Sequence, residues 1–259
     1  MTTTISLTET DRAQLREQGW LRVPGVLPEP MRLQALRTIN ASIGAGVEPS
    51  QVAVYNASSF CPELRSHPDL LGLFEASPAR ALVEGLFGRG AVLPVTTAQI
   101  ALRFPTRAAT PPPITPHIDG FPSPGNGVPA GSIHAFAALA AVFLEDVRGP
   151  WAGNFTVWPG SHRALGAWFR AHGADPSLPA GIPPSLAPGA GPGGLGEALQ
   201  IEARAGDLVL CPYLLAHAAA ANLSPHIRYA VFFRLQHAVH DGRPVEALLR
   251  DPFLGWKGL

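Results

Sequence analysis

Five short apolar runs, each bounded by Gly, Pro or Asp, dominate the chain from about residue 92 onward. They lie at residues 97–104, 134–144, 155–158, 207–216 and 228–235. Runs of this length between turn-forming residues predict β-strands. Because no clear helix separates each strand from the next, the pattern favours an antiparallel sandwich or jelly roll over a parallel, doubly wound sheet.

The first ninety residues have the opposite character and predict helices. Thr8 and Asp11 have the spacing of a capping box, and Gly19 is expected to end the first helix. A second helix is expected to begin after Pro28 and to end with Gly44 in a left-handed cap. Two shorter helices are expected near residues 68–74 and 78–87. We therefore expect a helical layer over about residues 1–90 and a β core over about residues 91–240.

Composition restricts the class of protein further. The 259 residues are 46% apolar, which is enough for one core, so a single domain over 1–259 is expected. Basic and acidic residues number 19 each, so neither nucleic acid nor a membrane surface is an expected partner. Lys257 is the sole lysine, which argues against Schiff-base and P-loop enzymes.

The expected location is the cytoplasm. The N-terminal residues lack the basic and apolar regions of a signal peptide, and the longest apolar run, at residues 135–144, is about half the length that a membrane-spanning helix needs. The pattern predicts no particular oligomeric state.

Residues 171–197 are rich in Pro, Gly, Ala and Ser and show little apolar periodicity. Such a stretch is too long for an ordinary connection and too poor in apolar residues to pack a core. We expect it to form a lid or an insertion loop.

Two strand-adjacent segments carry the residues best suited to chemistry. His117 and Asp119 form an HxD pair in a turn-rich segment, and His217 ends the apolar segment GDLVLCPYLLAH. An HxD pair alone is common by chance, but two imidazoles and one carboxylate can occupy one face of an octahedral ion and leave three positions open. This donor set suits Fe(II), and a curled sheet is needed to bring the three residues together.

Arg228 follows His217 by eleven residues and begins the last predicted strand. If its side chain points into the same barrel, the buried guanidinium needs an anionic partner to offset its desolvation. A dicarboxylate cosubstrate supplies one, because guanidinium binds carboxylate through two parallel hydrogen bonds.

With these residues in place, the chain resembles the phytanoyl-CoA dioxygenase family of Fe(II)- and 2-oxoglutarate-dependent oxygenases. The resemblance spans most of the chain: EQGWLRVPGVLPEPMRLQALR near the N-terminus, HID and GNFTVWPGSHR in the middle, and His217, Asn222, Ser224 and Arg228 near the end. One departure is Ala219, since family members often place Ser two residues after the distal histidine. His162, in PGSH, is expected to shape a turn through hydrogen bonds.

The resemblance implies a double-stranded β-helix, cupin-like and mainly β, with N-terminal helices. It implies that His117, Asp119 and His217 hold Fe(II) and act in catalysis, that Arg228 binds the distal carboxylate of 2-oxoglutarate, and that Gln99 contributes to the cosubstrate pocket. The expected reaction uses O2 to hydroxylate or otherwise oxidise a small organic molecule, releasing succinate and CO2. Two alternatives stay open: a cupin-type metal enzyme that does not use 2-oxoglutarate, and a non-catalytic ligand-binding barrel.

Overall fold

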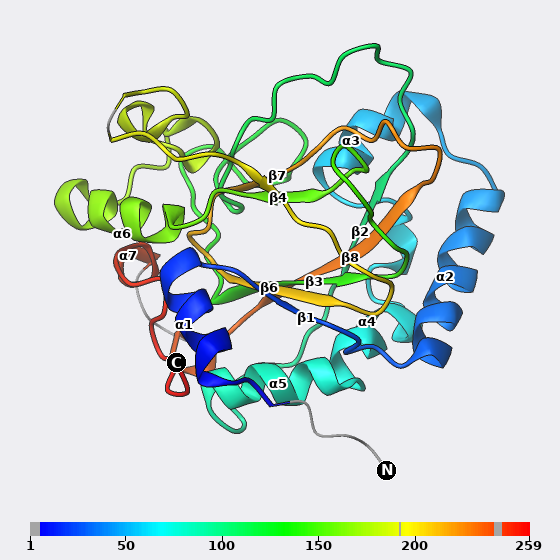
Figure 1. Ribbon diagram of the computed structural model, residues 1–259, viewed down its shortest axis with the longest axis horizontal. Helices are drawn as coiled ribbons and strands as arrows, with labels where there is room; N and C mark the ends of the chain where they lie inside the picture. The colour runs from blue at the N-terminus through cyan, green and yellow to red at the C-terminus, as the bar shows by residue number, and fades with distance from the viewer. Residues whose placement is uncertain (1–5, 192, 241–244) are drawn as a thin grey trace.

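Two antiparallel sheets face each other at the centre of the protein (Figure 1). The computed structural model describes residues 6–191, 193–240 and 245–259. The larger sheet has the order β1 (Leu21–Val23), β6 (Leu208–Pro212), β3 (Ala138–Phe143), β8 (Arg228–Leu235) and β2 (Gln99–Arg103). The smaller sheet has the order β5 (Leu199–Gln200), β4 (Phe155–Val157) and β7 (His217–Ala219). The expectation of antiparallel strands is confirmed.

Helices surround the two sheets, and α4 and α5 cover the side of the larger sheet that faces away from the smaller one (Figure 1). The α-helices are α1 (Glu9–Gln18), α2 (Glu29–Gly44), α3 (Val52–Ala57), α4 (Pro68–Glu75), α5 (Pro78–Phe87), α6 (Ser161–His172) and α7 (Val245–Arg250). Short 3-10 turns are η1 (Pro49–Gln51), η2 (Pro62–Leu64), η3 (Pro179–Gly181), η4 (Pro184–Leu186) and η5 (Ala238–His240).

Local signals explain where the N-terminal helices begin and end. The capping box of α1 is confirmed, because the amide of Asp11 donates to the Thr8 hydroxyl and the amide of Thr8 donates to the Asp11 carboxylate. Gly19 ends α1 in the left-handed conformation, as expected. The prediction for Gly44 was wrong: it is the last residue of α2, and the left-handed glycine is Gly46, two residues later.

The larger sheet has a helix-covered face and a face that looks into the space between the sheets. Successive side chains of a strand point to opposite faces, and β8 follows this rule. Phe233 packs against Phe74 of α4, with ring centroids 5.7 Å apart, whereas Phe232 packs against Phe155 of the smaller sheet at 5.4 Å. Each face therefore has its own apolar cluster, and the one between the sheets also borders the site described below.

The expectation of a mainly β protein is met only in part: two antiparallel sheets form the centre, but helical residues outnumber strand residues in the described chain. Helices α6 and α7 lie outside the expected N-terminal layer, and β1 lies within it. The expected run at 207–216 also divides into two parts. Strand β6 ends at Pro212, the next residues turn, and His217 begins β7 in the other sheet. This change of sheet places His217 opposite the HxD segment.

The segment 171–197 was expected to contribute nothing to the core, and this was wrong for three residues. Leu178, Ile182 and Leu195 are buried in the apolar cluster between the sheets. The segment includes η3 and η4, and the carbonyl of Ala180 accepts a 2.9 Å hydrogen bond from the amide of Ile118. It therefore packs directly against the HxD segment, and its role as a lid stays a prediction.

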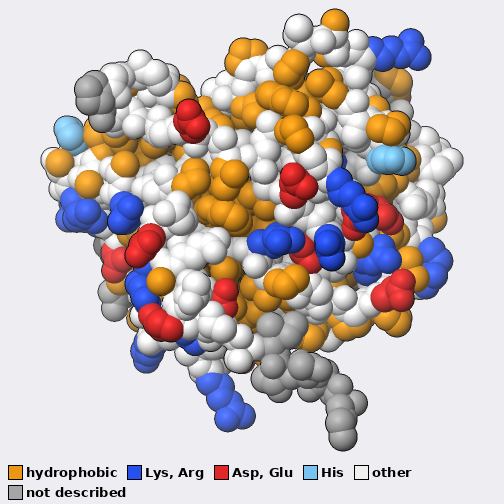
Figure 2. All heavy atoms as spheres, viewed as in Figure 1, with side chains coloured by type: hydrophobic (Ala, Val, Ile, Leu, Met, Phe, Trp, Pro, Cys, Tyr) orange, Lys and Arg blue, Asp and Glu red, His pale blue; other side chains and the backbone are white. Residues whose placement is uncertain are grey.

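Acidic and basic side chains are intermingled on the face shown in Figure 2, around apolar side chains at its centre. Among the residues that the structure describes, no helix is both long enough and apolar enough to cross a bilayer. The cytoplasmic location stays a prediction.

Candidate active site

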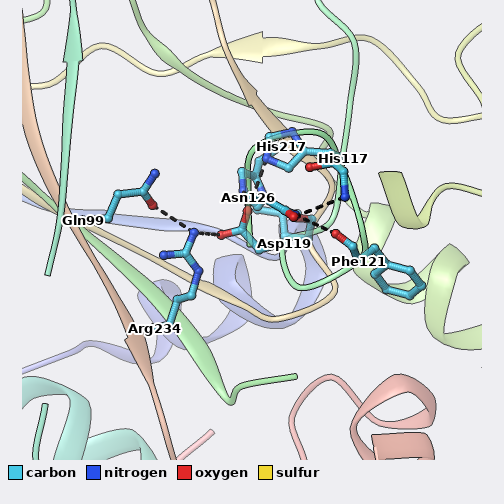
Figure 3. Close-up of polar contacts among 9 residues, drawn as sticks. Gln99, His117, Asp119, Phe121, Asn126, His217 and Arg234 are labelled. Atoms are coloured by element: carbon cyan, nitrogen blue, oxygen red, sulfur yellow. Dashed lines mark hydrogen bonds and ion pairs between the residues drawn. The ribbon is translucent and has the colours of Figure 1, made fainter. Parts of the chain in front are cut away.

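His117, Asp119 and His217 converge at one side of a cavity between the two sheets. One potential ligand atom from each residue lies within 4.8 Å of the others. The Asp119 Oδ1 atom is 3.3 Å from His117 Nε2 and 3.6 Å from His217 Nε2. Figure 3 shows the carboxylate directed toward the two imidazoles. The convergence that the sequence predicted for these three residues is confirmed.

Backbone pairing brings the two histidines together. The amide of His117 donates to the carbonyl of His217 at 2.9 Å, and the reverse bond measures 3.0 Å. The alternation of an extended segment turns Ile118 into the apolar core, so His117 and Asp119 both face the cavity. Gly120 follows in the left-handed region of backbone conformation, with a φ of +81°. A Cβ at this position would lie 2.1 Å from the His134 carbonyl oxygen, so the turn requires glycine.

The orientation of these side chains suits a cation between them. His217 Nδ1 lies 2.9 Å from the Leu215 carbonyl oxygen, which only accepts, so Nδ1 donates this hydrogen bond and Nε2 is the ring nitrogen that faces Asp119. Desolvation and the neighbouring His217 lower the pKa of His117. Two imidazole nitrogens and one carboxylate oxygen therefore surround one small space. This donor set fits a divalent metal such as Fe(II).

Arg234 binds the other oxygen of the Asp119 carboxylate. Its Nη2 atom is 2.6 Å from Asp119 Oδ2 and 2.9 Å from Gln99 Oε1 (Figure 3). Burial alone would raise the pKa of Asp119, but Arg234 and the two imidazoles outweigh it and hold this pKa well below its ordinary value. Asp119 is therefore ionised at neutral pH, with Oδ2 held by Arg234 and Oδ1 directed toward the histidines.

The cavity has a volume of about 320 Å³, within the range of small-molecule sites. Its floor is formed by alternate residues of β2 and β8, which run from Arg103 and Arg228 at one end to Gln99 and Arg234 at the other. Ala101 and Phe232 lie between these ends and make the middle apolar. The floor thus carries cations at both ends of an apolar strip.

Arg228 is the buried end of this floor. It is 2% exposed, its Nε donates to the Gly153 carbonyl at 2.8 Å, and its Nη1 donates to the Ala101 carbonyl at 3.2 Å. Burial and then the neighbouring Arg103 lower its pKa well below the ordinary value. No acidic side chain among the described residues pairs with it. A buried cation without an acidic partner is costly, and an anion bound beside it would offset that cost.

The structure brings together every residue that the sequence singled out for the site. His117, Asp119, His217, Arg228 and Gln99 all line one cavity, although Gln99 contacts Arg234. Sequence reasoning missed two further lining arginines: Arg103 and Arg234. A period-two reading of RYAVFFRL could have found Arg234, because it lies six residues after Arg228 and so on the same face of the strand.

His162 lies outside the cavity and has a structural role. It is 0% exposed, and its Nε2 is 3.1 Å from the Arg16 carbonyl oxygen of α1. The hydrogen bond confirms the expected type of contact, but His162 lies in the first turn of α6 and bridges two helices instead of shaping a loop.

Comparisons with solved structures show that the chain has a known overall fold. The crystal structure of SnoK, a non-heme alpha ketoglutarate dependent carbocyclase from nogalamycin biosynthesis, has a TM-score of 0.58 and 21% identity, covering 91% of this chain and 89% of SnoK. HygX from Streptomyces hygroscopicus, solved with nickel and 2-oxoglutarate, has a TM-score of 0.55 and 16% identity over 89% of this chain and 87% of HygX.

The epimerase SnoN, solved with Fe3+, alpha ketoglutarate and nogalamycin RO, has a TM-score of 0.50 and 23% identity over 88% of this chain and 82% of SnoN. No protein-family model and no curated protein matches the chain. The chain therefore shares the fold of these iron and 2-oxoglutarate enzymes at low sequence identity.

Proposed function

We propose that this protein is a non-haem Fe(II)- and 2-oxoglutarate-dependent oxygenase, similar to the phytanoyl-CoA dioxygenase family, with a double-stranded β-helix core in a single domain. It hydroxylates or otherwise oxidises a small organic molecule and releases succinate and CO2. The observation that carries the proposal is the presence, in one cavity, of the His117–Asp119–His217 cluster and of the buried, unpaired Arg228.

The metal would be held by His117, Asp119 and His217. Bound Fe(II) supplies a centre at which a 2-oxo acid and O2 react, so that the acid loses CO2 and the organic substrate is oxidised. Arg234 keeps Asp119 Oδ2 engaged, which leaves Oδ1 for the metal, and the bond from His217 Nδ1 to the Leu215 carbonyl keeps Nε2 free. Both contacts fix the ligand atoms before any metal binds.

The cosubstrate would lie along the cavity floor. Arg228 would bind its distal carboxylate, because this guanidinium has no acidic partner among the described side chains. The apolar middle of the floor, with Ala101 and Phe232, would pack against the carbon chain and exclude water from it. A dicarboxylate thus complements a floor that alternates between cationic and apolar parts.

Anaerobic addition of Fe(II) and 2-oxoglutarate to the purified protein tests this function. A visible metal-to-ligand charge-transfer band, followed by succinate formation when O2 is admitted, is the expected result. Iron-dependent turnover of a substrate without any need for 2-oxoglutarate would identify a cupin-type enzyme of another kind. Absence of both iron binding and succinate formation would identify a ligand-binding barrel.

A further inference from the structure

Arg103 and Arg228 lie side by side at one end of the cavity. They are direct partners in the antiparallel pairing of β2 with β8. Residues that oppose each other in such a pair point to the same face of the sheet, with Cβ atoms about 5 Å apart. Both residues line the cavity, and Gly153 of the opposite layer approaches them closely: a Cβ there would lie 2.8 Å from Arg103 Cβ and 3.2 Å from Arg228 Cβ.

Neither guanidinium has an acidic partner in the part of the chain that the structure describes. Asp119 is the carboxylate that lines this cavity, and Arg234 already binds it. Burial lowers the pKa of Arg103, and burial together with Arg103 lowers that of Arg228. Two neighbouring cations therefore repel each other in a desolvated site, and a bound anion would relieve both costs.

The hydrogen bonds of the pair leave one matching donor group on each residue. Arg103 uses Nη1, which donates to Asn56 Oδ1 at 2.6 Å and to the Leu102 carbonyl at 3.0 Å. Arg228 uses Nε and Nη1 for backbone carbonyls. The Nη2 group of each arginine makes no hydrogen bond to the described residues. Two such groups match the two oxygens of a single carboxylate.

We propose that Arg103 and Arg228 together form a two-arginine site for the distal carboxylate of 2-oxoglutarate. This inference rests on the proposed function and adds a residue to it. It also accounts for Ala219, which lines the same cavity and offers no hydroxyl at the position where similar proteins often have serine. The contact of Arg103 with Asn56 of α3 holds the second guanidinium in place and links the site to the helical layer.

Calorimetric titration of the Mn²⁺-loaded protein with 2-oxoglutarate, without O2, tests the proposal on wild type and Arg103→Gln. Loss of one charge-assisted contact predicts a Kd that is about 10- to 100-fold higher. The second ligand is 2-oxopentanoate, which has the same carbon chain but a methyl group in place of the distal carboxylate. Its Kd should be the same for both proteins, because Arg103 then has no partner to lose.

Three controls make the result specific. Arg107→Gln removes the same charge from an exposed position four residues away and should leave the 2-oxoglutarate Kd unchanged. Arg103→Lys keeps the charge without the planar fork and should give an intermediate Kd. Mn²⁺ affinity and the melting temperature report whether each variant is folded and retains its metal site.

Two results would overturn the inference: an unchanged Kd for 2-oxoglutarate in Arg103→Gln, or an equal loss of affinity for both acids. The first outcome would leave Arg228 as the single arginine of the carboxylate site. Failure of the wild-type protein to bind 2-oxoglutarate, despite binding Mn²⁺, would instead contradict the proposed function.

Discussion

The close approach of Gly153 to the two arginines predicts a large effect of a single added methyl group. In Gly153→Ala the new Cβ would meet Arg103 Cβ at 2.8 Å and Arg228 Cβ at 3.2 Å, and the residue would keep a φ of +73°. The left-handed backbone costs alanine about 1–2 kcal/mol, and forced overpacking adds about 1–3 kcal/mol. We expect lower stability together with displaced guanidinium groups.

Gly90→Ala separates these two contributions. Gly90 has nearly the same φ, +71°, but a Cβ there would have nothing within 4 Å. It should carry the backbone cost alone. Since 1 kcal/mol corresponds to about 2–4 °C for a chain of this size, Gly153→Ala should melt about 2–12 °C below Gly90→Ala.

Thermal denaturation followed by circular dichroism measures the stability difference, and calorimetric titration with 2-oxoglutarate measures the effect on the site. Only Gly153→Ala should bind the acid more weakly, by about tenfold or more, because misplaced donors lose a charge-assisted contact. Equal melting temperatures and equal 2-oxoglutarate affinities for the two variants would refute the idea that Gly153 positions the arginine pair.

Three further predictions concern individual side chains. His217→Ala should abolish stoichiometric Fe(II) binding and turnover, and full iron-dependent turnover in this variant would contradict the metal site. Arg228→Ala should weaken 2-oxoglutarate by about 2–5 kcal/mol, or about 30- to 4,000-fold in Kd; an unchanged Kd would mean that the arginine serves structure alone. Desolvation lowers the pKa of His162 from 6.5 to about 4 in the folded chain. The unfolded chain therefore takes up the proton first, and stability should fall by about 3 kcal/mol as the pH drops from 6.5 to 4. Urea denaturation at pH 7 and pH 4 should show a smaller loss in His162→Gln, whereas the same loss in both proteins would exclude His162 as its source.

Helices and strands with strong local signals could be predicted from the sequence. The Thr8 capping box depends on residues within one turn, and it occurs as expected. Helix α6 carries no such signal, because its N-cap is Gly160 and no side chain caps it. The end of β6 at Pro212 and the start of β7, in the other sheet, at His217 depend on tertiary packing, which an apolar run alone does not predict.

Site residues that follow one another at a recognisable spacing in the sequence could be predicted. Site residues that come together only through the pairing register of two strands could not. His117, Asp119, His217 and Arg228 have recognisable spacing in the sequence. Arg103 becomes important because the pairing of β2 with β8 places it opposite Arg228. That register follows from the whole sheet, so neither the arginine pair nor the contact between Arg234 and Asp119 could be inferred from spacing alone.

The two-faced character of β8 has a consequence for how this protein can diversify. Arg228, Phe232 and Arg234 line the cavity, whereas the residues between them, such as Val231 and Phe233, pack under the helices. Alternate residues of this eight-residue strand thus determine two different properties, ligand binding on one face and thermal stability on the other. Substitutions at the cavity positions can change the ligand specificity while the residues between them keep the sheet packed against the helices. Related sequences can therefore differ in the ligands that they bind and still share this fold.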